Sequence, residues 1–156
     1  HCDVMKELRS GTLPDALQFD ALADLSVSFG FLHHIPLPQW RAAFLEALIE
    51  ATKPGGFACI SLWRFLTDDG LAAKAKASTT SGIAELGYPK EQFDEGDCLL
   101  GWRNKAGAYR YCHSFSDAEI QDLIETVSGS AQLLARFQAD GRTGNLNEYL
   151  VFQRNW

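Results

Sequence analysis

The chain has 156 residues, of which 46% are hydrophobic and 22% charged, and this composition suits one ordinary globular domain. Its formal net charge of -6 at pH 7 argues against a protein that holds nucleic acid over a uniformly basic surface. The sequence has no apolar stretch of the ~20 residues that a membrane span needs and opens with no basic-then-apolar signal segment, so we expect a cytoplasmic protein without membrane contact.

The first half of the chain predicts a strand, a helix and a second strand. Residues 25–32, LSVSFGFL, are apolar at nearly every position, which predicts a strand buried on both faces, as in a parallel sheet. We expect a helix over 38–52, because Pro38 suits a first helical position and the apolar side chains fall on one face. The KPGG sequence at 53–56 would end that helix, and FACISLW at 57–63 is a second buried strand. This order predicts a βαβ unit with parallel strands and a right-handed crossover.

The second half of the chain predicts two helices and a terminal hairpin. Residues 68–85 have a helical pattern but are rich in small residues, which indicates a lid or a mobile arm. The stretch over 97–115 is expected to be a loop, and SDAE at 116–119 is a capping box that begins the next helix. Residues 133–139 and 148–154 are predicted strands that pair antiparallel across the turn-rich DGRTGN. The predicted fold class is therefore α/β, a parallel sheet finished by an antiparallel hairpin.

The expected loop carries cations and aromatic side chains but no acidic residue between Asp97 and Asp117. Its members of these two kinds are Arg103, Lys105 and Arg110, with Trp102, Tyr109, Tyr111 and Phe115. Cations for phosphates and flat rings for bases are what contact with a single-stranded nucleic acid requires. A solvated loop whose aromatic side chains return to the core explains the same pattern. Both interpretations stay open at this point.

The cysteines and histidines show no spacing typical of a metal site. The cysteines lie far apart, without a CxxC motif, at Cys2, Cys59, Cys98 and Cys112. We interpret them as reduced, structural thiols of a cytoplasmic protein. No pair among these cysteines and the histidines at positions 1, 33, 34 and 113 has chelating spacing, so no metal site is predicted.

A series of segments shares its pattern and order with one family of enzymes. ADLSVSFGFLHHIP at 23–36, followed by the predicted helix, KPGG and a strand, resembles strands four and five of the class I S-adenosylmethionine-dependent methyltransferases. GDCLLGW at 96–102, YRYCHSF at 109–115 and GNLNEYLV at 144–151 are similar to the tRNA wobble-uridine carboxymethyl methyltransferases, the group of yeast Trm-nine and the AlkB-homologue-eight methyltransferase. Glycine stands at position 101, where that group has proline before the tryptophan.

The resemblance implies a Rossmann-like sheet, S-adenosylmethionine as cofactor and methyl transfer as the activity. It covers only strands four to seven, because the sequence has no GxGxG turn and no room for earlier strands before residue 25. We therefore expect a single methyltransferase-like domain over 1–156 that lacks the N-terminal half of the fold. HCDVM at 1–5 is interpreted as the tail of strand three, which matches Asp3 to the family position that accepts the adenine amino group.

The resemblance also implies three sets of site residues. The expected cofactor side consists of Asp3, Val4, Phe29, Gly30 and Leu32. The expected catalytic residues are Arg110, His113 and His34. The expected substrate contacts are His33, Trp63, Trp102, Tyr111 and Arg103.

A carboxylate acceptor explains why cations and histidines matter in this set. The methyl group of a sulfonium is already activated, so alignment supplies most of the rate and no catalytic triad is expected. A carboxylate does need a cation to fix one oxygen in line, and Arg110 is the best candidate. Structural explanations stay open: a surface ion pair for Arg110, a core position for Trp63, and helix capping or a backbone hydrogen bond for one of the two histidines.

Three functions fit the sequence. The first is a carboxyl O-methyltransferase that acts on a modified tRNA wobble uridine, with an activating protein partner as a further expectation. The second methylates a small carboxylic acid, which the acidic remainder of the chain favours. The third is a non-catalytic binding or scaffold module, because a half-sheet without its glycine loop exposes the edge and face of its first strand and invites a homodimer.

Overall fold

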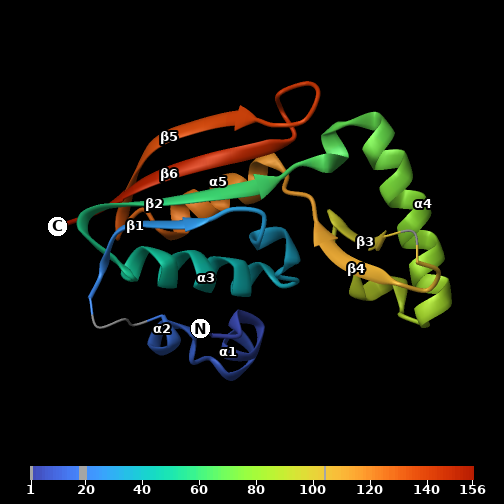
Figure 1. Cartoon of the computed structure of the whole chain (residues 1–156), viewed down its shortest axis with the longest axis horizontal. Helices are drawn as coiled ribbons and strands as arrows, with labels where there is room; N and C mark the ends of the chain where they lie inside the picture. The colour runs from blue at the N-terminus through green and yellow to red at the C-terminus, as the bar shows by residue number, and fades with distance from the viewer. Residues whose placement is uncertain (1, 18–20, 104) are drawn as a thin grey trace.

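The structure is a computed structural model that describes residues 2–17, 21–103 and 105–156 (Figure 1). Its helices and 3-10 turns are α1 (Val4–Ser10), α2 (Leu13–Ala16), η1 (Leu32–His34), α3 (Pro38–Glu50), η2 (Phe65–Thr67), α4 (Asp69–Leu86), η3 (Lys90–Gln92) and α5 (Asp117–Thr126). Its strands are β1 (Ala23–Ser28), β2 (Thr52–Trp63), β3 (Asp97–Gly101), β4 (Tyr109–His113), β5 (Ala131–Ala139) and β6 (Asn147–Arg154). None of the described helices is both long and apolar enough to cross a membrane.

Four strands form the main sheet in the order β1-β2-β6-β5. β1 pairs parallel with β2 through the crossover helix α3, which confirms the predicted βαβ unit. β6 pairs antiparallel with both β2 and β5, so the last strand lies inside the sheet and its hairpin partner β5 forms the edge. The predicted α/β class and the antiparallel terminal hairpin are both confirmed.

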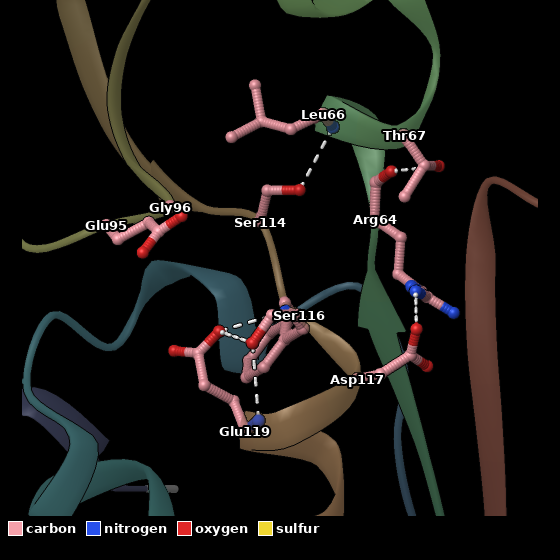
Figure 2. Close-up of a pocket in the computed structure, with 10 residues that line it drawn as sticks. Arg64, Leu66, Thr67, Glu95, Gly96, Ser114, Ser116, Asp117 and Glu119 are labelled. Atoms are coloured by element: carbon pink, nitrogen blue, oxygen red, sulfur yellow. Dashed lines mark hydrogen bonds and ion pairs between the residues drawn. The ribbon is translucent and has the colours of Figure 1, made fainter.

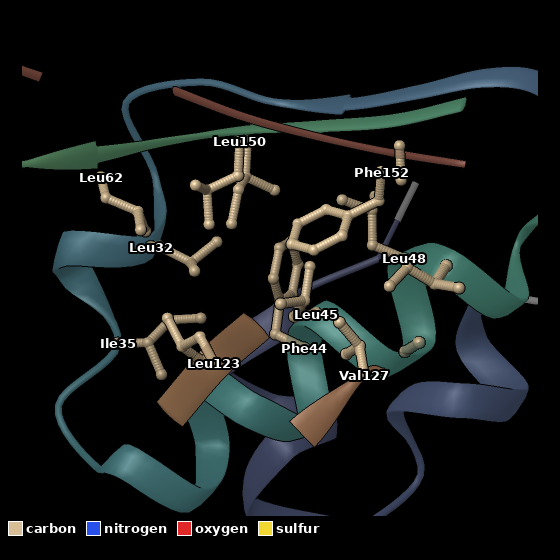
Figure 3. Packing of buried hydrophobic residues seen from close by; sticks show 14 of the residues in the cluster. Leu32, Ile35, Phe44, Leu45, Leu48, Leu62, Leu123, Val127, Leu150 and Phe152 are labelled. Atoms are coloured by element: carbon tan, nitrogen blue, oxygen red, sulfur yellow. The ribbon is translucent and has the colours of Figure 1, made fainter. Parts of the chain in front are cut away.

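The main core lies between one face of this sheet and the helices α3 and α5 (Figure 3). Leu150 and Phe152 on β6 point from the sheet toward Phe44 and Leu48 on α3, and all four are at most 8% exposed. Val127, directly after α5, closes the core from the second helix. Burial of such side chains is the main favourable contribution to folding, each adding about 1.5–3 kcal/mol.

The opposite face of the sheet is not covered by any described element, which corrects the prediction of a strand buried on both sides. Leu25 and Val27 on β1 are 56% and 51% exposed, while Ser26 and Ser28 between them are buried. Phe57 on β2 continues the exposed apolar face at 41%. The continuous apolar run was a correct sign of a parallel strand, but it does not say which face has a partner.

Two boundaries also differ from prediction near the ends of the first strands. β1 ends at Ser28 rather than at residue 32, because Gly30 takes a left-handed conformation with φ of 65° and η1 follows at once. α3 ends at Glu50, and the KPGG segment lies within β2, where Thr52 is the partner of Ala23.

The N-terminal segment is helical and not the tail of a strand. Asp3 is the N-cap of α1, and its carboxylate accepts a hydrogen bond of 3.1 Å from the Lys6 amide. This local capping contact explains the aspartate without a third strand. The expectation built on HCDVM was wrong for the described residues, and His1 lies outside them.

The stretch expected to be a loop is a β-hairpin. β3 and β4 pair antiparallel, with Cys98 opposite Cys112. The helix α4 lies along β3, where the Ser78 hydroxyl donates to the Leu99 carbonyl at 2.7 Å and accepts from the Gly101 amide at 2.9 Å. These bonds fix α4 to the hairpin, in contrast to the expected lid or mobile arm.

Candidate functional site

The carboxyl ends of β1 and β2 lie beside the hairpin, and the side chains that meet there form the candidate site. His33 and His34 on η1 follow β1, with ring centroids 4.2 Å apart. Trp63 ends β2, and its ring lies 5.0 Å from that of His33. Ligands of open α/β sheets bind beyond the carboxyl ends of the strands, so this position agrees with the one expected from sequence.

Arg110 on β4 completes this group from the hairpin side. Its guanidinium lies 5.7 Å from the Trp63 ring centroid and 5.0 Å from that of Trp102. Both distances are within the range of a cation–π contact. Its Nε atom is buried and has no hydrogen-bond partner among the described residues. We call His33, His34, Trp63, Trp102 and Arg110 together the histidine–arginine cluster.

The charge of the cluster is carried by Arg110 and not by His33. Burial, together with the neighbouring His34 and Arg110, lowers the pKa of His33 to about 4. His33 is therefore neutral at pH 7 and can donate or accept a hydrogen bond without adding charge. A cation held between two indole rings beside a neutral imidazole is an arrangement that suits a small planar anion.

His113 lies away from this cluster, which corrects its expected catalytic role. Its ring is fully buried, with Nδ1 2.7 Å from an Asp97 oxygen and Nε2 2.7 Å from a Glu119 oxygen. Burial opposes the charged imidazolium, but the hydrogen bonds with both carboxylates outweigh it and raise the pKa of His113. With both nitrogens bound and no exposed surface, His113 joins the hairpin to α5 and cannot contact a substrate.

Tyr111 is shared between this buried network and the site. Its hydroxyl donates to Asp97 and to the Pro36 carbonyl, and burial and the Asp97 carboxylate raise its pKa. Its own carbonyl accepts a hydrogen bond of 3.0 Å from Nδ1 of His34. Tyr111 and His34 line a cavity of about 500 Å³ that Arg9 on α1 and Phe93 also border. The tyrosine can therefore shape a pocket wall, while its hydroxyl is already engaged.

Arg103 and Trp102 lie at the exposed end of the hairpin. The Trp102 side chain is 42% exposed, and the guanidinium of Arg103 lies 5.2 Å from its ring centroid. Arg103 has a left-handed backbone with φ of 51°, as expected in a tight connection between two strands. These two residues can reach a large ligand from outside.

The expected cofactor residues do not lie together. Asp3 caps α1, Val4 packs against the main core, and the Leu32 side chain is fully buried in that core. Phe29 and Gly30 alone lie open at the end of β1, where Phe29 is 56% exposed and no atom lies within 4 Å of a Cβ added at Gly30. The described residues therefore fit one side of S-adenosylmethionine at most: the buried Leu32 side chain is out of reach, which corrects that expectation, while the contact from Asp3 stays a prediction.

A second pocket, of about 290 Å³, lies where β2 meets the start of α5 (Figure 2). Its polar groups already pair with each other: Ser116 bonds with Glu119, and the Arg64 guanidinium lies 3.0 Å from Asp117. Arg64 and Arg136 also bind Glu148 at 2.9 Å and 2.6 Å, which closes a ring of ion pairs with Asp117. This ring was not predicted from the sequence, although Glu148 lies within the segment GNLNEYLV at 144–151.

Comparison with known proteins supports the fold and nothing narrower. The sequence matches no protein-family model and no curated protein. An S-adenosylmethionine-dependent methyltransferase from Methanosarcina mazei has a TM-score of 0.61 at 15% identity over 90% of this chain and 64% of that one. One from Clostridium acetobutylicum has a TM-score of 0.57 at 9% identity over 97% and 70% of the two chains.

These likenesses define the chain as an α/β protein with the Rossmann-like fold of S-adenosylmethionine-dependent methyltransferases. The chain spans less than two thirds of the Methanosarcina mazei structure. The identities are too low to carry an activity or a substrate from those proteins to this chain.

Proposed function

We propose that this chain forms the acceptor side of an S-adenosylmethionine-dependent methyltransferase that methylates a carboxylate. The observation that carries the proposal is the position of Arg110, held between Trp63 and Trp102 with a buried, unpaired Nε. A buried donor without a partner is costly unless a ligand satisfies it. The fold and the location at the carboxyl ends of β1 and β2 support the reaction class.

The residues of the cluster account for the chemistry that such a reaction needs. S-adenosylmethionine, when bound, supplies a methyl group on a positively charged sulfur, so a carboxylate oxygen attacks without a general base. Arg110 binds the carboxylate and fixes one oxygen in line. Neutral His33 holds the second oxygen by a hydrogen bond, and the Trp63 ring excludes water from the same place. His34 is held by the Tyr111 carbonyl and borders the acceptor cavity.

A modified wobble uridine of tRNA is the acceptor that the exposed end of the hairpin favours. Trp102 offers a flat face for a base, and Arg103 beside it offers a cation for a phosphate. The net charge of -6 favours the second candidate, a small carboxylic acid, since the described basic residues around the site are few. In the tRNA case, a partner protein would add positive charge to the binding surface.

Methyl transfer from labelled S-adenosylmethionine tests the proposal. The enzyme is the natural full-length polypeptide, and the acceptors are bulk tRNA and a panel of small carboxylic acids. We expect incorporated label that mild alkali releases as methanol, because a carboxyl methyl ester is hydrolysed while an N-methyl group is not. Arg110→Gln should lower kcat/KM about 100-fold through loss of the charged hydrogen bond. Arg142→Gln, at an exposed arginine of the β5–β6 turn, is the matched control and should act like wild type.

Three outcomes would contradict the proposal. Alkali-stable label would mean that the acceptor is not a carboxylate. Wild-type activity in Arg110→Gln would mean that another group binds the acceptor. Absence of transfer to every acceptor, together with self-association through the open sheet face, would favour the scaffold alternative.

A further inference from the structure

We propose that His33, His34 and Cys112 form a binding site for a thiophilic transition-metal ion, with zinc as the first candidate. One ligand atom from each of the three residues lies within 4.8 Å of the other two. The residues come from η1 and β4, which are far apart in the sequence, so no ligand spacing could reveal the site in advance. Imidazole and thiolate are the ligands that zinc prefers in proteins. The site shares His33 and His34 with the histidine–arginine cluster, but metal binding is tested without methyl transfer.

His33 supplies the first indication of a missing ligand. The residue is only 8% exposed, and its buried Nδ1 has no hydrogen-bond partner among the described residues. Buried polar atoms in native proteins are nearly always satisfied, so an unpaired one needs an explanation. A metal ion bound by the ring provides that partner.

His34 is already oriented in the way that metal-binding histidines usually are. Its Nδ1 lies 3.0 Å from the carbonyl oxygen of Tyr111, and a carbonyl can only accept a hydrogen bond. Nδ1 therefore carries the hydrogen, which leaves the lone pair on Nε2. A backbone carbonyl that fixes the tautomer and the ring orientation is the common outer contact of a histidine ligand.

Cys112 supplies the soft ligand. It is fully buried, and its sulfur lies beside the His34 ring, 3.8 Å from Nδ1, the nitrogen that bonds the Tyr111 carbonyl. When the metal binds, the thiol proton goes to solvent and the sulfur lone pair forms the new bond, so one proton is released per ion. Cys98, opposite Cys112 on β3, is also buried but lies outside the group.

The geometry requires a small adjustment and leaves one coordination position open. Ligand atoms of a tetrahedral zinc site lie about 3.5 Å apart, so the three atoms must approach by about 1 Å. Rotation of the His33 ring, whose Nδ1 has no hydrogen-bond partner among the described residues, can supply this movement while His34 keeps its bond to Tyr111. Three protein ligands and an open fourth position are typical of zinc sites that bind water or a substrate. The open position would lie next to Arg110, whose charge favours an anionic fourth ligand.

Titration of the metal-free protein with Co²⁺ tests the site directly. We expect one tight equivalent, with visible absorption bands of tetrahedral intensity and a near-ultraviolet thiolate-to-cobalt band that added Zn²⁺ removes. Cys112→Ser should abolish the thiolate band, and Cys98→Ser should keep it, which makes this the matched control. His34→Ala should weaken binding at least about tenfold. A pH indicator in weak buffer should record about one proton released per ion.

The results that would overturn the proposal are equally specific. The site does not exist if wild type gives no thiolate band, or if Cys112→Ser binds Co²⁺ as wild type does. Should Cys112→Ser fail to fold, as judged by circular dichroism, His34→Ala decides by the same spectra. None of these readouts involves methyl transfer, so failure of the proposed function would leave them unchanged.

Discussion

The contact that holds the main sheet to its helices is apolar, whereas the contact that holds the β3–β4 hairpin to α5 includes buried ionisable groups. Phe152 and Leu150 meet Phe44 in a core without a polar partner. At the hairpin, His113 is buried between Asp97 and Glu119. Apolar packing tolerates many arrangements, while hydrogen-bonded ions require one geometry. The difference shows how one domain can obtain its stability from one region and the position of its site from another.

Removing an aromatic side chain from the apolar core should have the largest effect. Phe152→Ala should lower the free energy of unfolding by about 4 kcal/mol, because it leaves a cavity at a position that is 1% exposed. Phe57→Ala, on the open face at 41% exposure, is the matched control and should cost about 1 kcal/mol. Urea denaturation followed by circular dichroism measures both values. Equal losses would mean that the open face is covered in solution.

Disrupting the buried network around His113 should have the second-largest effect on the free energy of unfolding. His113→Gln leaves at least one of two carboxylates without its partner, and we expect a loss of about 3 kcal/mol in the free energy of unfolding. His34→Gln removes one hydrogen bond to a carbonyl and should cost about 1 kcal/mol. The same denaturation experiment applies. A smaller loss for His113→Gln than for His34→Gln would mean that the His113 network stabilises the fold less than a single hydrogen bond does.

The stability difference between wild type and His113→Gln should depend on pH. The raised pKa of His113 stabilises the fold below the unfolded value of about 6.5, and this contribution is lost as pH rises through the folded pKa. Burial raises the pKa of Glu119, but hydrogen bonds from His113 and Ser116 outweigh it and bring the value to about 2. The stabilisation that Glu119 provides is therefore present above about pH 4.5 and lost as the pH falls toward 2.

The stability difference between wild type and His113→Gln should therefore be greatest between about pH 4.5 and 6.5. For each titrating proton, it should change by at most about 1.4 kcal/mol per pH unit. His33 has a lowered pKa and destabilises the fold as pH falls below 6.5, but it titrates in both proteins and cancels. Denaturation curves at a series of pH values give the profile. A difference that stays constant from pH 4 to 9 would contradict the raised pKa of His113.

The smallest expected effect concerns the exposed end of the hairpin. Arg103→Gln should weaken tRNA binding a few-fold and make the plot of log affinity against log salt shallower by about one unit, since one phosphate contact is lost. Filter binding at several salt concentrations measures this, with Arg142→Gln as control. An unchanged slope with binding intact would place the nucleic acid elsewhere or favour a small acceptor.

The same comparison explains what the sequence could predict. Apolar periodicity and the capping box at Ser116 report local structure, so the βαβ unit, α5 and the terminal hairpin were predicted correctly. The hairpin at 97–113 was interpreted as a loop, because its pattern of cations and aromatic side chains resembles an exposed surface. Its order comes from contacts with distant α4 and α5 that no local pattern records.

The sequence indicates the location of the candidate site but not which of its residues are engaged in structural contacts. The position of His33 and His34 directly after a predicted parallel strand places them at the carboxyl ends of β1 and β2, and Arg110 lies beside them; their roles stay predictions. The sequence gives no way to separate the roles of His113 and Arg110, since both lie on β4, three positions apart, in a segment that resembles a catalytic motif. Asp97 and Glu119, which decide the role of His113, lie in different elements.

Amide hydrogen exchange of wild type and His113→Gln tests most directly whether charged contacts position the site while the apolar core holds the fold. Mass spectrometry of peptides resolves β3 and β4 from β2 and β6. We predict much faster exchange in the hairpin of the variant, with β2 and β6 as protected as in wild type. Equal acceleration in all four strands, or none in the hairpin, would contradict the separation of the two roles.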